Sequence, residues 1–252
     1  MESRRHRGVA RRVTRAERVK PVAVAIVCKT PMPGQSKTRL SPPLRPVECA
    51  ALSACFIQDL ARTIATLAQD GAVTGVALYT PRGSEALLRP LLPDGFELLL
   101  QSDGGLTERL NNGVQDILDA GHDGVILVNS DSPTLPLSIL HAAVDALQRG
   151  DNVVLSPAYD GGYTLIGLTR PHPRLFEDIP WSTGAVHRVT LERAREIGLP
   201  VVAVPGWYDI DDAAALTMLE DELAGRATPF DAITGAQAPA TRRFLRARIQ
   251  RA

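Results

Sequence analysis

The sequence predicts an α/β fold in three layers, with a mostly parallel central sheet and helices on both faces. Near-continuous apolar segments rich in β-branched residues recur along the chain, which is typical of strands buried on both faces. Segments with helical periodicity separate most of these strands, and strands that alternate with helices favour a parallel sheet. Polar clusters rich in glycine and proline follow several of the strands, where such sheets bind their ligands.

The clearest strand covers 22–28, where V-A-V-A-I-V-C is apolar throughout. The same kind of pattern, shorter or weaker, predicts six further strands, at 75–79, 96–101, 124–129, 152–156, 164–168 and 201–204.

A loop rich in proline and glycine follows the first strand and leads into a long helical pattern. Predicted helices cover 46–69, 106–120, 136–149, 184–197 and 211–223. No internal repeat or low-complexity linker interrupts this pattern, so we expect one domain over 21–225. It is flanked by a basic extension at 1–20 and a C-terminal tail at 226–252 that is basic at its end.

The net charge of zero hides an asymmetry between the ends and the body of the chain. Residues 1–20 hold eight Lys or Arg and two Glu, and residues 241–252 hold five Arg and no acid, which leaves 15 basic and 26 acidic residues between them. An acidic body argues against a nucleic-acid-binding surface on the domain. The basic ends are expected to be solvated tails, with contact to an anionic partner as the alternative.

Cellular location is predicted from what the sequence lacks. No apolar run approaches the ~20 residues that span a bilayer. The Arg-rich first segment has no apolar stretch of the secretory kind. The three cysteines form neither a C-x-x-C pair nor a metal-binding spacing, and Cys28 lies in an apolar strand. These features predict a cytoplasmic protein with no membrane span.

Four polar clusters each lie just after a predicted strand or between two strands: 29–40, 129–134, 158–163 and 206–212. The carboxyl ends of parallel strands meet at one edge of a sheet, so we expect these distant segments to form one site.

The first cluster is K-T-P-M-P-G-Q-S-K-T-R-L, at 29–40. Gly34 frees the backbone to approach a ligand, and Lys29, Lys37 and Arg39 bring three cations to an acidic domain, which favours phosphate binding. The cluster is neither a Walker loop nor G-x-G-x-x-G. The alternative is a solvated basic loop.

The second cluster, V-N-S-D-S-P at 128–133, places Asp131 at the end of a buried strand. A carboxylate there is suited to Mg²⁺, which takes one or two carboxylates together with phosphate oxygens. The alternative reading is that Asp131 or Ser132 caps the following turn.

The third cluster, S-P-A-Y-D-G-G-Y at 156–163, sets Asp160 beside Gly161 and Gly162 between two strands. We interpret it as a backbone clamp on an acceptor molecule, with Asp160 near the metal or acting as a base. The alternative is that the two glycines make a tight hairpin turn.

An aromatic segment, I-P-W-S-T, places Trp181 beside Ser182 and Thr183, and these three residues are candidates to close over the acceptor. Trp181 as an ordinary core residue is the alternative. Arg109, near the start of a predicted helix, is a candidate to reach the nucleotide.

The fourth cluster is G-W-Y-D-I-D-D, at 206–212. Asp209 and Asp211 point to the same side if this piece is extended, giving a pair of carboxylates. Asp211 or Asp212 is expected to cap the next helix, which leaves Asp209 as the second metal candidate. The five histidines are scattered, and no nucleophile-base triad is recognisable.

Five motifs, in order, resemble the DUF2064 family: K-T-P-M-P-G-Q-S-K-T-R-L, S-D-S-P, D-G-G-Y-T-L-I-G-L, I-P-W-S-T and W-Y-D-I-D-D. That family is labelled as glycosyltransferases of the nucleotide-diphospho-sugar transferase (GT-A) superfamily. The resemblance covers about 22–223 and implies a Rossmann-like GT-A sheet. It further implies a nucleotide on the first loop and Mg²⁺ or Mn²⁺ on the S-D-S-P aspartate.

Carried over by motif, the resemblance implies nucleotide contacts from Lys29, Gly34, Lys37 and Arg39, and a metal contact from Asp131. It implies that Asp160, Asp209 and Asp211 surround the acceptor and the metal.

The sequence departs from the family pattern at two points. The D-x-D signature of the superfamily appears as S-D-S at 130–132, so a second metal carboxylate must come from elsewhere. Asp212 stands where the last motif usually has Thr. The K-T-R-L piece also resembles the K-S-R-L loop of the 2-phospholactate guanylyltransferase family.

The leading hypothesis is therefore metal-dependent glycosyl transfer from a nucleotide sugar to a small acceptor, with Asp160 or Asp209 orienting or deprotonating the acceptor hydroxyl. The second is nucleotidyl transfer from an NTP to a phosphate or carboxylate, with release of pyrophosphate. The third is a catalytically silent nucleotide-binding module. Three strand ends with intact carboxylates argue against the third.

Overall fold

The computed structural model describes residues 21–226 and 233–250. It contains one seven-stranded sheet with the strand order β3-β2-β1-β4-β6-β5-β7. The predicted extension at 1–20 lies outside the described residues. The strands are β1 Val22–Lys29, β2 Val73–Thr80, β3 Glu97–Leu100, β4 Gly124–Asn129, β5 Val153–Pro157, β6 Tyr163–Leu168 and β7 Val201–Ala203.

All strand pairs are parallel except those of β6, which runs antiparallel to both β4 and β5. The prediction of seven strands in a mostly parallel sheet is therefore confirmed. β1 lies near the middle of the sheet, paired with β2 and β4, which explains why its sequence is apolar on both faces.

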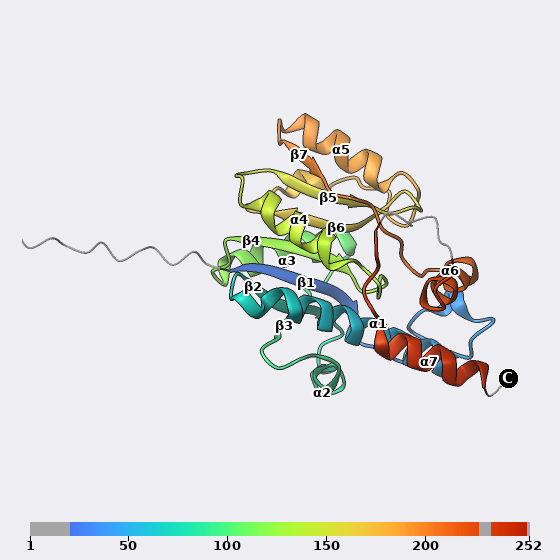
Figure 1. Cartoon of the computed structure of the whole chain (residues 1–252). Coiled ribbons are helices and arrows are strands. Elements are labelled where there is room, and N and C mark those ends of the chain that lie inside the picture. Colours follow the sequence, from blue (N-terminus) through green and yellow to red (C-terminus); the bar gives the residue numbers. More distant parts are fainter. Residues whose placement is uncertain (1–20, 227–232, 251–252) are drawn as a thin grey trace, which may run out of the picture.

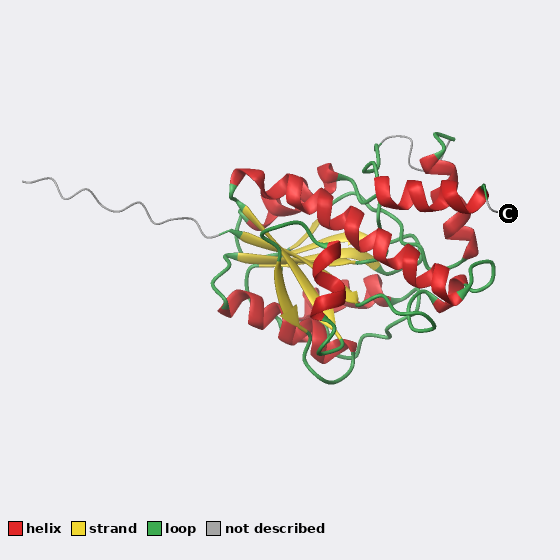
Figure 2. Cartoon of the chain, turned by 90° about the horizontal axis from the view of Figure 1, so that it is seen from below, coloured by secondary structure: helices red, strands yellow, loops and turns green. Residues whose placement is uncertain are grey.

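Helices cover both faces of the sheet (Figures 1 and 2). Alternate residues of β1 enter different cores: Val24 and Ile26 belong to the core that includes residues of α1, α4, α6 and α7, while Ala23 and Ala25 belong to the core that includes residues of α3 and α5. The helices are α1 Pro46–Leu67, α2 Glu85–Leu88, α3 Leu106–Asp119, α4 Leu137–Leu147, α5 Val186–Glu196, α6 Ala213–Leu223 and α7 Pro239–Ile249, with 3-10 turns η1 Thr38–Leu40, η2 Ala68–Asp70, η3 Arg89–Leu91 and η4 Pro173–Leu175.

The five predicted helices are present as α1, α3, α4, α5 and α6. Two of them begin as the sequence suggests: Pro46 opens α1 at the first position, and the Asp212 carboxylate accepts a hydrogen bond from the Ala215 amide (2.9 Å) to cap α6. Because Asp212 makes the cap, Asp209 and Asp211 remain available to the site. No described helix has both the length and the apolarity needed to cross a membrane.

The described part of the C-terminal segment differs from the predicted tail. α7 lies against α1 (Figure 1), and its Ala240 and Leu245 are buried in the core. Asp59 of α1, which is only 2% exposed, accepts hydrogen bonds from the amides of Ala240 (2.9 Å) and Thr241 (2.8 Å). A carboxylate from another helix thus caps α7, which the basic sequence of this segment did not suggest.

The cap on α7 is predicted to contribute to global stability. Asp59→Ala leaves two buried amides at the start of α7 without partners, so we expect the free energy of unfolding to fall by about 2–3 kcal/mol. Urea unfolding followed by circular dichroism measures this. Asp116→Ala, at an exposed position of α3, is the matched control and should change the free energy by less than about 0.5 kcal/mol. Equal losses for both variants would contradict the role of Asp59.

Candidate active site

The four polar clusters meet at the carboxyl edge of the sheet, as the sequence predicts. The loop after β1 contacts both the loop after β4 and the segment after β7 through Lys37. The amide of Ile210 donates to the carbonyl of Asp131 (3.0 Å), which joins the last segment to the loop after β4. Trp207 pairs with Ala158 next to the β5–β6 hairpin, so that all four segments are in contact.

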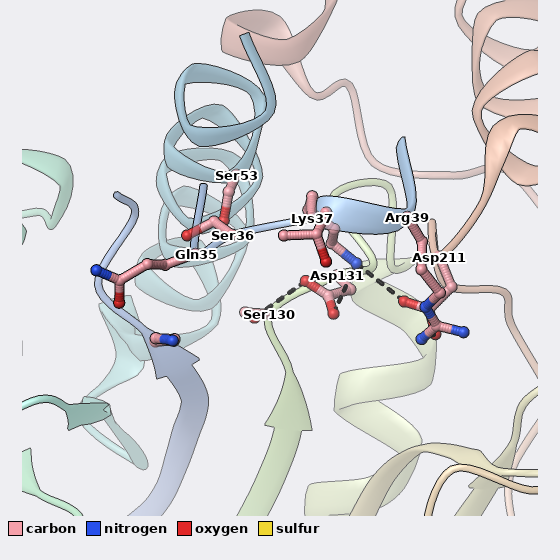
Figure 3. A pocket seen from close by; sticks show the side chains of 10 residues that line it. Gln35, Ser36, Lys37, Arg39, Ser53, Ser130, Asp131 and Asp211 are labelled. Atoms are coloured by element: carbon pink, nitrogen blue, oxygen red, sulfur yellow. Dashed lines mark hydrogen bonds and ion pairs between the residues drawn. The ribbon is translucent and has the colours of Figure 1, made fainter. Parts of the chain in front are cut away.

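Lys37 is the centre of this junction. Its Nζ lies 2.7 Å from Asp131 Oδ2 and 3.0 Å from Asp211 Oδ1 (Figure 3). It also donates to the carbonyl of Ile210 at 2.6 Å. The Lys37 side chain is only 7% exposed, whereas both carboxylates are 31% exposed. Burial acts to lower the pKa of Lys37, but Asp131 and Asp211 outweigh it and hold the pKa above its ordinary value.

The backbone of the loop after β1 is shaped for this contact. Gly34 has φ 74° and Lys37 has φ 50°, both in the left-handed region. That conformation is uncommon for lysine, and such residues are concentrated at functional sites. Arg39, two residues later, is 70% exposed and donates to Asp211 Oδ2 at 2.8 Å.

A first cavity, of about 240 Å³, opens beside Lys37. It is bordered by all three cations predicted to bind phosphate and by Asp131 and Asp211, which lie beside Lys37 and Arg39 (Figure 3). Its lining residues are Lys29, Gln35, Ser36, Lys37, Thr38, Arg39, Ser53, Ser130, Asp131 and Asp211. Ser53 of α1 was not predicted, although a buried serine on the apolar face of a helix is a signal that could have revealed it.

A second cavity, of about 190 Å³, adjoins the first, and the two share Ser130 and Asp131. Its lining residues are Val27, Leu106, Leu110, Asn129, Ser130, Asp131, Asp160, Gly162, Tyr163, Trp181, Ser182, Thr183, Val186 and Asp209. This list includes the predicted acceptor residues Gly162, Trp181, Ser182 and Thr183. Asn129 and Tyr163 were missed by sequence reasoning.

The third cluster is both a turn and part of the site. The 158–162 segment is a hairpin between antiparallel strands, closed by a hydrogen bond from the Ala158 amide to the Gly162 carbonyl (3.0 Å). Gly161, with φ 90°, packs so closely on Gly184 that a side chain would meet its carbonyl oxygen at 2.2 Å. The glycine therefore lets the hairpin dock on the 182–187 loop and sets Asp160 in place.

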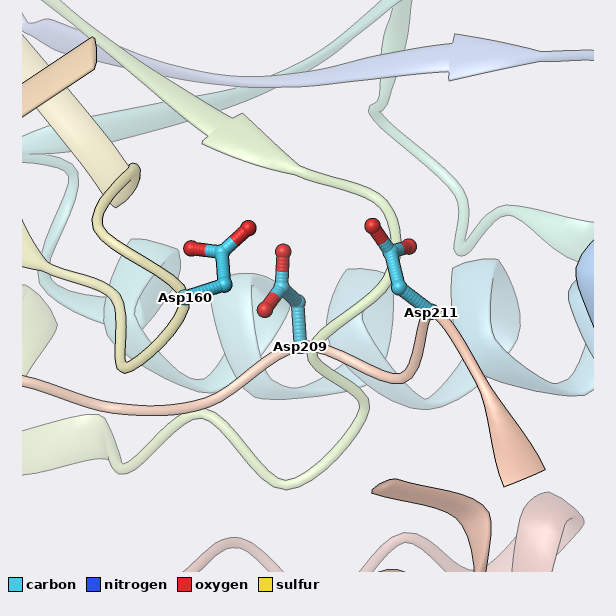
Figure 4. Close-up of side chains that lie close together, drawn as sticks. All are labelled: Asp160, Asp209 and Asp211. Atoms are coloured by element: carbon cyan, nitrogen blue, oxygen red, sulfur yellow. The ribbon is translucent and has the colours of Figure 1, made fainter. Parts of the chain in front are cut away.

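Three carboxylates come together at the junction of the cavities. One oxygen each from Asp160, Asp209 and Asp211 lies within 4.8 Å of the others, and we call this group the carboxylate trio (Figure 4). Asp209 and Asp211 alternate along an extended segment and project to the same side, as predicted. Burial and then the charges of Asp160, Asp211 and Asp131 raise the pKa of Asp209 to about 7.

Asp211 behaves differently from Asp209. Burial acts to raise its pKa, but the charges and hydrogen bonds of Lys37 and Arg39 prevail, so its pKa lies below the ordinary value. Asp211 was expected beside the acceptor, yet it lines the first cavity instead of the second. Its pairing with both Lys37 and Arg39 places it on the side of the predicted phosphate contacts.

The carboxylate trio suits a divalent cation, because Mg²⁺ and Mn²⁺ prefer clustered carboxylate oxygens. The trio includes Asp209, one of the two predicted metal ligands. The other, Asp131, borders both cavities but is paired with Lys37. Arg109, predicted to reach the nucleotide, lies on α3 and lines neither cavity.

Residues 63–183 match the family model described as "Uncharacterized protein conserved in bacteria (DUF2064)". The match confirms the resemblance to the DUF2064 family. No curated protein is similar enough to the chain in sequence to count as a match.

Among solved structures, the chain is similar to a "putative nucleotide-diphospho-sugar transferase" from Desulfovibrio desulfuricans G20. The two are 29% identical with a TM-score of 0.76, over 91% of this chain and 95% of that chain. This likeness, together with the DUF2064 match, supports a transferase of the nucleotidyl- or sugar-transferase kind.

Two more distant structures have the same fold. One is CMP:2-keto-3-deoxy-manno-octonic acid synthetase complexed with CTP, with 10% identity and a TM-score of 0.53 over 81% of this chain and 99% of that chain. The other is a cytidylyltransferase from Leptospira borgpetersenii serovar Hardjo-bovis (strain JB197), with 11% identity and a TM-score of 0.52 over 92% and 95%. At these identities the likeness concerns the fold alone.

The raised pKa of Asp209 predicts a pH dependence of stability in the absence of metal. Between pH 3.8, the ordinary pKa, and about 7, the folded state binds more protons at Asp209 than the unfolded state does. The free energy of unfolding should therefore fall as the pH rises through this range, and above about pH 7 the ionised Asp209 should destabilise the folded state by a constant amount. Asp209→Asn removes this ionisation. After allowance for solvent screening we expect the variant to be about 1–3 kcal/mol more stable than the wild type at pH 8.

Urea unfolding in EDTA at pH 5 and pH 8 measures this difference. Asp145→Asn, at an exposed position of α4, is the control and should follow the wild type. A wild-type pH dependence that survives in Asp209→Asn would show that Asp209 does not titrate in this range.

Proposed function

We propose that the chain transfers a glycosyl group from a nucleotide sugar to a small acceptor, with Mg²⁺ or Mn²⁺ held by Asp209 and Asp211 of the carboxylate trio. The observation that carries this proposal is the junction of the two cavities. Lys29, Lys37 and Arg39 border one side, the carboxylates of Asp160 and Asp209 border the other, and Asp131 is common to both. The 29% identity to the Desulfovibrio protein, over nearly the whole of both chains, supports the same class of donor.

The first cavity is the proposed site of the donor's phosphates. Lys29, Lys37 and Arg39 bring three positive charges to it, and charge-assisted hydrogen bonds are the strongest that a phosphate can receive from side chains. Arg39 is well exposed, so it can contact a phosphate while it remains beside Asp211. Ser36 and Ser53 add hydroxyl groups to the same wall.

Asp209 is the proposed central metal ligand, with Asp211 beside it, and a cation bound there would neutralise the leaving diphosphate. Asp209 lies between Asp160 and Asp211 (Figure 4), and the charges around it disfavour its ionised form. A cation would relieve that repulsion, which is the physical reason for the assignment. Asp131 would support the site from its ion pair with Lys37.

Asp160 is the proposed group that orients the acceptor and takes the proton of its hydroxyl. It is the most exposed member of the trio and lines the second cavity. The Gly162 amide donates to Asp160 Oδ1 at 2.8 Å, which fixes the carboxylate and leaves the other oxygen available to the acceptor. Trp181, Ser182 and Thr183 complete the acceptor side.

Nucleotidyl transfer is the second candidate, because the three cations of the first cavity suit a triphosphate as well as a diphosphate.

The two reactions release different products. Incubation with Mg²⁺, a panel of nucleotide sugars and NTPs, and a panel of acceptors should release NDP from a nucleotide sugar. Asp209→Asn and Asp131→Asn should each lose at least 100-fold of this activity. Release of pyrophosphate from an NTP, with no NDP from any nucleotide sugar, would contradict glycosyl transfer and support nucleotidyl transfer.

If the cations of the first cavity contact the phosphates, variants that lack one of these side chains should bind nucleotides more weakly. We expect Arg39→Ala to weaken the binding of nucleoside diphosphates at least tenfold, since one charge-assisted contact contributes about 1.5–3 kcal/mol. The melting temperature should hardly change, because Arg39 is largely exposed. Lys37→Ala should weaken binding similarly but also lower the melting temperature, because Lys37 is buried between two carboxylates.

Isothermal titration calorimetry with UDP, GDP, CDP and ADP measures this effect. Arg188→Ala, in an exposed ion pair with Glu192, is the control and should keep wild-type affinity. Equal wild-type affinity for a nucleoside and its diphosphate would contradict a phosphate role for these cations.

A further inference from the structure

Charge is divided unequally between the two cavities. The first is lined by Lys29, Lys37 and Arg39, whereas the fourteen lining residues of the second include three carboxylates and no Lys, Arg or His. The carboxylates are Asp131, Asp160 and Asp209. An anionic group placed in the second cavity would thus meet like charges at close range and no side-chain cation.

Two of the three cations of the first cavity are already engaged with carboxylates, and the third, Lys29, lines only the first cavity. The Lys37 ammonium is buried and contacts Asp131, Asp211 and the Ile210 carbonyl at 2.6–3.0 Å. Arg39 lies on Asp211, which lines only the first cavity. Moving Lys37 to the second cavity would leave the partially buried Asp131 without its cation, and moving Arg39 would remove one of the two cations paired with Asp211.

A bound dication would not reverse this balance. Asp131, Asp160, Asp209 and Asp211 carry four negative charges when ionised, and Lys29, Lys37, Arg39 and one dication carry five positive charges. The diphosphate of a donor then adds further negative charge. A diphosphate carries at least two negative charges, so among the described residues that line the two cavities no positive charge remains for a second phosphate at the junction.

Part of the lining of the second cavity is apolar. Val27, Leu110 and Val186 line it together with the ring of Trp181. The Trp181 Nε1 donates to Thr107 Oγ1 at 2.8 Å, and Thr107 Oγ1 donates to the Phe176 carbonyl at 3.1 Å. The one polar atom of Trp181 is therefore satisfied within the protein, and Thr107 fixes the ring as an apolar surface.

We propose that the second cavity accepts an uncharged hydroxyl compound with an apolar face, such as a sugar ring, and rejects phosphorylated or carboxylated acceptors. Trp181 would pack against the apolar face, and the lining carboxylates would receive hydrogen bonds from the hydroxyls. The proposal rests on the proposed function, since it takes the second cavity as the acceptor side.

The test compares uncharged and phosphorylated members of matched pairs: methyl glucoside with glucose 6-phosphate, methyl mannoside with mannose 6-phosphate, and glycerol with glycerol 3-phosphate. Binding is followed by tryptophan fluorescence. The chain has two tryptophans, and Trp207 is 1% exposed, so a ligand in the second cavity is reported by Trp181. We expect at least one uncharged compound to bind at least tenfold more tightly than its phosphorylated partner, and the signal to disappear in Trp181→Phe.

A charge placed in the cavity provides a gain-of-function test. Leu106, the first residue of α3, lines the second cavity and is 40% exposed, so a lysine can be accommodated there. Leu106→Lys should improve the binding of the phosphorylated compounds at least tenfold. Leu87→Lys, at a 61% exposed leucine of α2 outside both cavities, is the control and should not change it.

The outcomes separate this proposal from the proposed function. Tighter wild-type binding of the phosphorylated compounds, or no binding of any uncharged compound, would overturn the acceptor class. NDP release with a phosphorylated acceptor would overturn it too, while leaving glycosyl transfer intact. Pyrophosphate release from an NTP with an uncharged acceptor would overturn glycosyl transfer and support the acceptor class.

Discussion

The buried ammonium of Lys37 is the interaction on which the geometry of the site depends. It joins three segments that are far apart in the sequence: its own loop after β1, Asp131 after β4, and Asp211 with the Ile210 carbonyl after β7. A lysine with only 7% of its side chain exposed requires partners of opposite charge, and its two carboxylates supply them. The left-handed backbone at Lys37 brings the chain to this position.

Lys37 pairs with Asp131 and Asp211 but not with Asp209, so the aspartates of the junction differ in their electrostatic surroundings. Asp209 has no cation among the groups that shift its pKa, and its neighbours raise that pKa, whereas the pKa of Asp211 is lowered by Lys37 and Arg39. Two aspartates separated by one residue thus have opposite electrostatic surroundings. This difference divides the site into a side suited to phosphates and a side without cations.

Buried contacts support the segment that carries these aspartates. Trp207 Nε1 donates to Thr134 Oγ1 at 3.2 Å, and Tyr208 donates to Glu222 of α6 at 2.5 Å. The Ala236 amide donates to the Thr134 carbonyl at 2.9 Å, which extends the same network toward the C-terminal segment. The position of Asp209 and Asp211 is therefore coupled to α6 and to the residues that precede α7, and not to the sheet alone.

The sequence by itself determined the strands, the main helices and the edge of the sheet where the site lies. Strands such as β1 are recognisable because burial on both faces requires apolar residues along the whole segment, and this is a local pattern. The tertiary structure alone decided which charges meet: Lys37 and Asp131 are 94 positions apart, and Asp211 lines the cavity that holds the cations instead of the one that holds the predicted acceptor residues. It also decided the structure of the C-terminal segment. The arginine-rich sequence of this segment resembles a tail, but the segment packs as α7, and Asp59 caps its first amides. Apolar periodicity is encoded locally, whereas the partner of a charge depends on how separate loops are brought together by the fold.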